Sequence, residues 1–212
     1  FMLNHLCLDW SQAPFNEKYL QAIINTMDNA LMQHHRTLAV RVDLRLPEYR
    51  DIGDSISCTP NITRGLLSRF IRSAQSKIDA FQKRQAKQGK RINPCKVRYL
   101  WVKEIADASK PHFHVVLFVN KDTFRGLGDF LHTGDNLGSF IQDAWLSALG
   151  LEDYPDYRQL VHFPANPLYV LDINAANFQQ AYNALTFRIS YFAKEHTKVY
   201  DAYERSIGYS QC

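Results

Sequence analysis

Two histidines separated by one residue are the most informative chemical feature of this sequence. His112 and His114 flank Phe113 in a run of β-forming residues. Side chains two apart on a strand project from the same face, so both imidazoles can reach one ion while Phe113 points into the core. Such a pair also occurs as a purely structural feature whose ring nitrogens are satisfied by hydrogen bonds. A metal site therefore requires a third ligand.

Two carboxylates are candidates for that third ligand. Glu104 ends the preceding predicted strand, with a seven-residue connection between it and His112, and Asp43 lies on an earlier strand. Two imidazoles and a carboxylate suit Mn²⁺ or Mg²⁺ when a substrate supplies phosphate oxygens. Alternatively, Glu104 is a solvated residue at a hairpin end, and Asp43 is the ion-pair partner of Arg41 or Arg45. The sequence leaves these alternatives open.

A tyrosine and a lysine late in the chain are candidates for covalent chemistry. Tyr191 and Lys194 are three residues apart on a predicted helix and therefore share one face. Only about one part in a thousand of an ordinary phenol is ionised at neutral pH, so a nucleophilic tyrosine needs a nearby cation. Because the chain holds 11 tyrosines, such a pair also arises by chance. The pair gains weight only in combination with the histidines.

The hydrophobic pattern places these residues on an α+β framework. Helical periodicity predicts helices at 16–33, from about 61 through Phe81, at 140–149 and at 175–196. Asn16 is the expected N-cap of the first helix, and Asn61 or Thr63 that of the second. Alternation and β-branched residues predict strands at 38–46, 97–104 and 112–119, with one or two more in 160–172. The strands at 97–104 and 112–119 read as a β-hairpin.

This order of elements predicts an antiparallel or mixed sheet that helices cover mainly on one face. The other face would stay open and polar, and it would display Arg41, Asp43, Arg45, His112 and His114. One domain is expected for a chain of 212 residues. Within it, residues 1–35 would form an N-terminal helical extension and 201–212 a polar tail.

Positive charge is concentrated in one segment. Residues 61–96 contain ten Lys or Arg and one acid, Asp79, while the other 176 residues carry a net charge of −5. Such a segment is either a solvated helix face or a surface for a polyanion, and the imbalance favours nucleic acid. The predicted DNA-binding residues come from this segment and from the polar strand: Arg41, Arg45, Arg69, Arg72, Lys83 and Arg84.

Composition excludes several classes of protein. The chain is 46% hydrophobic and 22% charged, as expected for a globular protein. It has no apolar run of the roughly 18 to 20 residues that a membrane span requires, and its first ten residues do not resemble a secretory signal. The four cysteines form no CxxC motif, so neither a zinc cage nor a disulfide framework is indicated. A reducing cytoplasm is expected.

The ordered set of motifs resembles the HUH endonuclease superfamily of rolling-circle replication initiators, and more closely its inovirus (filamentous phage and prophage) replication-initiator-like members. The resemblance covers about residues 36–200. It consists of the strand ending in Val-Asp-Leu-Arg-Leu-Pro at 42–47, the hairpin from Glu104 to His112 and His114, and the helix with Tyr191-Phe192-Ala193-Lys194. A second tyrosine one turn from Tyr191 and a following helicase domain, both part of the fullest family pattern, are not found here.

The resemblance implies a ferredoxin-like antiparallel sheet and a set of residue roles. His112 and His114 would hold a divalent metal with Glu104 as third ligand, and Asp43 is the alternative. Tyr191 would attack the phosphate to form a 5′-phosphotyrosine, with Lys194 positioning or neutralising that phosphate. The partners would be single-stranded origin DNA and a host helicase and polymerase, in the cytoplasm of a bacterial host.

Three functions follow from these observations. The first is a metal-dependent enzyme that nicks and joins single-stranded DNA at the replication origin of a phage or mobile element. The second is a non-catalytic, prophage-encoded nucleic-acid-binding module on the same fold. The third is a metal-independent ribonuclease in which a histidine is the general base. A covalent adduct distinguishes the first from the other two.

Overall fold

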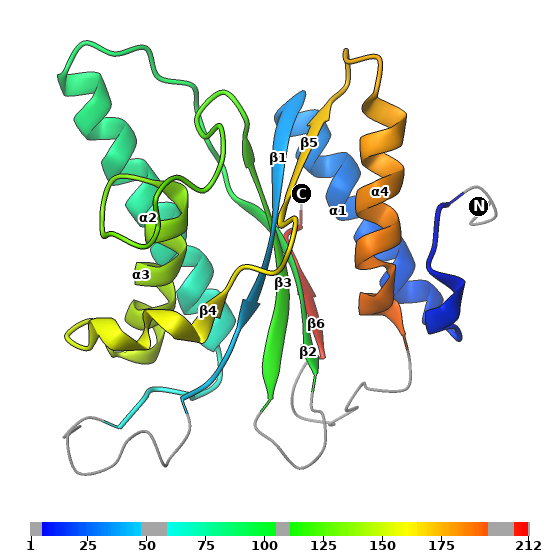
Figure 1. Ribbon diagram of the computed structural model, residues 1–212, viewed down its shortest axis with the longest axis horizontal. Coiled ribbons are helices and arrows are strands. Elements are labelled where there is room, and N and C mark those ends of the chain that lie inside the picture. The colour runs from blue at the N-terminus through cyan, green and yellow to red at the C-terminus, as the bar shows by residue number, and fades with distance from the viewer. Residues whose placement is uncertain (1–5, 48–58, 105–110, 195–205, 212) are drawn as a thin grey trace.

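A computed structural model describes residues 6–47, 59–104, 111–194 and 206–211 and confirms the α+β class (Figure 1). Within these residues, the centre is a six-stranded antiparallel sheet. Strand β1 lies between β3 on one side and β4 and β5 on the other, and β2 and β6 follow β3 outward. The strands are β1 (Arg36–Leu44), β2 (Arg98–Glu104), β3 (His112–Asn120), β4 (Val161–His162), β5 (Leu168–Asp172) and β6 (Ile207–Tyr209).

Helices cover both faces of the sheet, so the expectation that they pack mainly on one face is wrong. Figure 1 shows α2 (Leu66–Lys87) and α3 (Leu137–Leu149) on one side and α1 (Glu17–Gln33) and α4 (Phe178–Ser190) on the other. Each pair buries its own hydrophobic core against the sheet. The physical reason lies in β3, whose apolar run from Val115 to Val119 is continuous, because a strand buried on both faces does not alternate.

The alternation predicted along β1 is confirmed. Val40 and Val42 point into the core under α2 and α3, and Ala39 points into the core under α1 and α4. Arg41 and Asp43 share the face of Ala39, as the period of two requires. The face expected to be open is therefore apolar over most of its area and polar only towards one end of β1.

The helix ends match the sequence signals in part. The Asn16 side chain accepts a hydrogen bond from the Tyr19 N–H and caps α1, and Gly150, at φ +69°, ends α3. The N-cap predicted for α2 is wrong, because Gly65 occupies that position with no side-chain bond. Asn61 instead accepts a hydrogen bond from the Thr63 hydroxyl.

Described elements near both ends of the chain belong to the fold. Leu20, Ile23 and Met27 of α1 are buried in the core beside α4, so the predicted N-terminal extension includes an integral helix. In the predicted polar tail, of which 201–205 and 212 lie outside the described residues, β6 pairs with the outer edge of β2. Its Gly208 faces Trp101, whose ring an added Cβ would overlap. Any other residue at position 208 would therefore require the Trp101 ring to move.

The remaining described elements are short 3-10 turns: Trp10–Gln12, Pro155–Leu160 and Tyr191–Ala193. Among the described residues, no helix combines the length and the apolar character that spanning a bilayer requires.

Trp145 supports the sheet beneath the polar end of β1. It is fully buried on α3, packs edge-on against Phe70 and Phe113, and donates its indole N–H to the Arg45 carbonyl (2.9 Å). We expect Trp145→Phe to lower the free energy of unfolding by about 2 kcal/mol, because it leaves a cavity and an unpaired carbonyl. Urea denaturation followed by circular dichroism measures this.

The matched control is Trp10→Phe, since Trp10 is 67% exposed. It should change the free energy of unfolding by less than about 0.5 kcal/mol. Equal effects of the two substitutions would contradict the assigned core.

Candidate metal and tyrosine site

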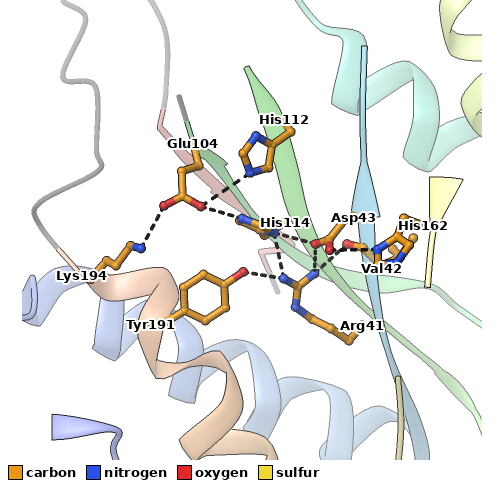
Figure 2. A network of polar contacts seen from close by, with 9 residues as sticks. All are labelled: Arg41, Val42, Asp43, Glu104, His112, His114, His162, Tyr191 and Lys194. Atoms are coloured by element: carbon orange, nitrogen blue, oxygen red, sulfur yellow. Dashed lines mark hydrogen bonds and ion pairs between the residues drawn. The ribbon is translucent and has the colours of Figure 1, made fainter. Parts of the chain in front are cut away.

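Three adjacent strands carry the predicted polar residues to one place. In the antiparallel register, Asp43 of β1 is opposite His114 of β3, and Glu104 of β2 is opposite His112. Directly opposed residues project from the same face of a sheet, so the four side chains gather on the side covered by α1 and α4. Figure 2 shows them converging there.

Glu104 and the two histidines form a compact cluster. Glu104 Oε2 lies 2.6 Å from His114 Nε2 and 3.7 Å from His112 Nε2. One ligand atom from each residue lies within 4.8 Å of the others. Ligands about 2.0 to 2.2 Å from a common ion are at most about 4.4 Å apart, so a small adjustment would let all three bind one ion. This donor set fits a divalent cation, and Glu104 is better placed than Asp43 as the third ligand.

Asp43 instead orients His114. Its Oδ1 lies 2.6 Å from His114 Nδ1, where it can accept a proton from that nitrogen, and Arg41 Nη2 lies 2.8 Å from the same nitrogen. This bond directs the Nε2 atom towards Glu104, as a second carboxylate commonly does behind a metal-binding histidine. Burial opposes the charge on Asp43, but the hydrogen bond from His114 and the charge of Arg41 outweigh it and hold the pKa of Asp43 far below its usual range.

The surroundings of His112 favour its neutral form. Burial, and to a smaller degree the neighbouring His114, lower the pKa of His112 below its ordinary value, although Glu104 and Asp43 act in the opposite direction. Neutral imidazole is the form that binds metal ions.

Arg41 lies at the centre of the network and is only 4% exposed. Its guanidinium donates to Asp43 Oδ1 (2.6 Å), to the Val42 carbonyl (2.8 Å) and to the Tyr191 hydroxyl. Its Nε atom has no hydrogen-bond partner among the described residues. Arg41 is thus an internal residue of the site rather than the surface DNA contact that the sequence suggested.

Tyr191 and Lys194 face the cluster from a turn just beyond α4. The α-helix ends at Ser190, Tyr191–Ala193 is a 3-10 turn, and Lys194 is extended. Ring centroids of Tyr191 and His114 are 5.2 Å apart, and the Lys194 ammonium lies 3.0 Å from Glu104 Oε1 (Figure 2). Each Glu104 oxygen therefore has a separate role, one towards the lysine and one towards the histidines.

The environment keeps the Tyr191 phenol protonated at neutral pH. Burial raises the pKa of Tyr191 more than the Arg41 charge lowers it, and the nearby carboxylates Asp43 and Glu104 raise it further. A cation close to Glu104 and Asp43 would oppose this effect, since it offsets the negative charge that disfavours phenolate.

The N-terminal segment holds the tyrosine turn. The contacts are from the Asp9 N–H to Ser190 Oγ (3.0 Å), from the Asn16 N–H to the Ala193 carbonyl (2.7 Å), and a β-bridge between Phe15 and Lys194. These are contacts between residues about 180 positions apart in the sequence, and no local pattern signals them.

His162 is a site residue that the sequence analysis missed. It is opposite Asp43 on the two-residue strand β4, its Nδ1 lies 3.5 Å from Asp43 Oδ2, and its side chain is 48% exposed. A strand this short has no periodicity to detect. Arg45 is also exposed near this end of β1, close enough for its charge to affect His112.

The basic residues predicted on α2 do not reach this site. Helix α2 packs on the opposite face of the sheet, which places Arg69, Arg72, Lys83 and Arg84 away from Tyr191 (Figure 1). Arg69 donates to the carbonyls of Asn61 and Ala148, and Arg84 pairs with Asp135. The sequence did not reveal which face each helix covers, so the DNA contacts predicted on α2 stay predictions for a surface separate from the candidate site.

The fold and the site define an α+β protein whose antiparallel sheet carries a histidine–glutamate cluster beside a tyrosine. A family model described as the YagK/YfjJ C-terminal domain matches residues 3–210, and the chain belongs to this family. It is 43% identical over 179 residues to "Uncharacterized protein YagK" of Escherichia coli (strain K12), covering 84% of this chain and 85% of that protein. It is 32% identical over 195 residues to "Uncharacterized protein YfjJ" of the same strain, covering 91% and 93%. No solved structure matches the chain.

The buried network gives Arg41 a measurable structural role. We expect Arg41→Ala to lower the free energy of unfolding by about 3 kcal/mol, because it leaves the carboxylate of Asp43 without its charged partner. Chemical denaturation at neutral pH measures the change. The control is Arg45→Ala, four residues further along the chain and exposed, with an expected change below about 0.5 kcal/mol. Unaltered stability of Arg41→Ala would contradict the network.

Proposed function

We propose that this protein is a metal-dependent endonuclease that nicks and rejoins single-stranded DNA through a 5′-phosphotyrosine, initiating rolling-circle replication of a phage or mobile element. One observation carries the proposal. The Tyr191 hydroxyl lies beside His114, on the same face of the sheet as Glu104 and His112. A nucleophile and a candidate metal cluster thus face a common point, although Tyr191 follows His114 by 77 residues in the sequence.

The geometry supports the following residue roles. Glu104, His112 and His114 would hold Mn²⁺ or Mg²⁺, and Asp43 would keep His114 in the orientation that binds it. The bound ion would supply positive charge that offsets the charge developing on the phosphoryl oxygens. Arg41 holds the Tyr191 oxygen from the other side, so the phenolate would form next to a fixed guanidinium.

The proposed step is a balanced exchange of phosphodiester bonds. The Tyr191 oxygen attacks phosphorus, and a tyrosyl O–P bond forms while the bond from phosphorus to the 3′-oxygen breaks. The phenol loses one proton and the released 3′-hydroxyl gains one. The phosphodiester energy is conserved in the protein–DNA linkage, so the reverse attack rejoins the strand. Lys194, 3.0 Å from Glu104, would lie close enough to contact the phosphate.

The single strand would enter along the edge of the sheet near β4. His162 and Arg45 are exposed there, next to Asp43, and both side chains suit phosphate contacts. A host helicase and polymerase would act with the protein in the bacterial cytoplasm, since a nicking domain alone opens no duplex.

A second candidate function is a non-catalytic nucleic-acid-binding module. It is favoured by the environment of Tyr191, where burial raises the pKa and Arg41 already contacts the hydroxyl. The two candidates differ in whether a covalent adduct forms.

The adduct is the first test. We expect wild-type protein incubated with a random-sequence pool of labelled single-stranded DNA and Mn²⁺ to yield a labelled band that survives boiling in SDS. Tyr191→Phe and EDTA should each abolish it. The pool removes the need to know the recognised sequence.

Tyr182→Phe is the matched control for this experiment. Tyr182 lies on α4, and its hydroxyl donates to Asp28 of α1 instead of facing the cluster. Its adduct yield should equal that of wild type. DNA binding without any adduct would favour the non-catalytic module, and cleavage that persists in EDTA would favour a metal-independent nuclease.

Metal binding is the second test. We expect Asp43→Asn to weaken Mn²⁺ binding about 10-fold to 100-fold, because it weakens the bond that orients His114. Electron paramagnetic resonance of free Mn²⁺ measures this directly. His162→Asn, which changes a neighbour of Asp43 outside the cluster, should bind Mn²⁺ as wild type does. Equal affinities for all three proteins would contradict the assigned role of Asp43.

A further inference from the structure

The outward face of α2 is a basic surface on the side of the sheet opposite the tyrosine. The apolar side of the helix, with Phe70, Ala74 and Ile78, is buried against the sheet and α3. At 100° per residue, Arg72, Lys83 and Lys87 fall within about 60° of one another on the opposite side of the helix. The first and last are separated by about 22 Å along the axis. The cations therefore form one line facing solvent.

This line continues into the turn that follows the helix. Lys90 and Arg91 are exposed there, as are Arg72, Lys83 and Lys87. We call these five residues the α2 surface. Within the described parts of the chain, none of the five forms an ion pair, whereas Arg84 on the flank pairs with Asp135. The single acid of α2, Asp79, accepts a hydrogen bond from Gln75. By the same 100° rule, Asp79 lies beside this line, so the α2 surface carries five cations with one neighbouring acid on the helix and a large excess of positive charge.

We propose that the α2 surface binds double-stranded DNA, as a site separate from the one that contains Tyr191. A row of cations on a rigid helix matches the regularly spaced phosphates of a nucleic-acid backbone. A membrane surface is a poorer partner, because the apolar face that an interfacial helix inserts into lipid is here buried in the core.

The absence of aromatic side chains favours a duplex over a single strand. Proteins that hold single strands without sequence preference stack bases on exposed aromatic rings. Between Leu66 and Lys87, which are all described, the aromatic residues are Phe70, which is buried, and Phe81, which packs against Phe124 and Phe140. The helix therefore offers contacts to phosphates but none to unstacked bases.

The two surfaces have different consequences for DNA. A duplex on α2 and a single strand at Tyr191 would lie on opposite sides of one sheet, so one molecule could hold both at once. Duplex binding itself requires neither a metal ion nor covalent chemistry. The proposal of duplex binding therefore does not depend on whether the protein is an endonuclease or a non-catalytic module.

The test is fluorescence anisotropy with a labelled duplex of about 20 random base pairs in EDTA, between about 50 and 200 mM salt. The triple variant Arg72→Gln/Lys83→Gln/Lys87→Gln should bind at least about tenfold more weakly than wild type. The slope of log affinity against log salt should fall by about 2 to 3, because up to three phosphate contacts are lost. A single strand of the same length should show a smaller loss.

The matched control removes the same charge from other elements. Lys18→Gln/Arg36→Gln/Arg98→Gln changes residues on α1, β1 and β2 and should retain duplex affinity within about twofold. Thermal melting by circular dichroism verifies that each variant is folded. Tyr191→Phe should bind the duplex as wild type does, which separates this result from that of the adduct experiment.

Three results would overturn the proposal. The first is that the wild type does not bind the duplex at the lowest salt concentration. The second is that the triple variant binds the duplex as tightly as the control variant does. The third is that the triple variant loses affinity for the single strand but not for the duplex. The first would direct attention to an acidic protein partner, and the last to a single-stranded ligand on α2.

Discussion

The register between β1, β3 and β2 is the constraint on which the candidate site depends. It pairs Asp43 with His114 and Glu104 with His112, so residues distant in sequence share one face of the sheet. A shift of β1 by one residue would turn Asp43 and Arg41 towards the core under α2 and α3. The apolar residues that alternate with them, Val40 and Val42, fix the register because each is fully buried on that side. The packing of the core thereby positions the polar site.

The same packing explains why the polar cluster lies at one end of the sheet. In the middle of β1, Leu38, Ala39 and Val40 are fully buried under helices on both faces, and a charged group there would have no partner or solvent. Near Asp43 and Glu104 the covering helix α4 gives way to a turn, and the charges satisfy one another. Arg41 connects β1 to the tyrosine turn through Asp43 and Tyr191, and its Nη2 also lies 2.8 Å from His114 Nδ1 of β3. A buried cation in this position stabilises the arrangement only while its partners are present.

The local chemistry of the site could be predicted from the sequence, and its surroundings could not. The hairpin that joins Glu104 to His112 and His114 was predictable, because the period of two on a strand is a property of the backbone. The preference for Glu104 over Asp43 as the third ligand depends on the register of the strands. The burial of Arg41 depends on the elements that cover it. No local sequence pattern contains either kind of information. The contacts of Asp9 with Ser190 and of His162 with Asp43 join segments more than 100 residues apart. The sequence correctly predicted a basic helix at α2. Only the structure shows that this helix covers the face of the sheet opposite the candidate site.

The proposed chemistry is tested most directly by locating the covalent bond. After reaction with single-stranded DNA and Mn²⁺, nuclease and trypsin digestion should release the peptide 189–194, in which Tyr191 is the sole tyrosine. Tandem mass spectrometry should find this peptide carrying a nucleotide phosphate on the tyrosine oxygen. A nucleotide on a peptide from another part of the chain, or unmodified 189–194 in DNA-bound protein, would contradict the account.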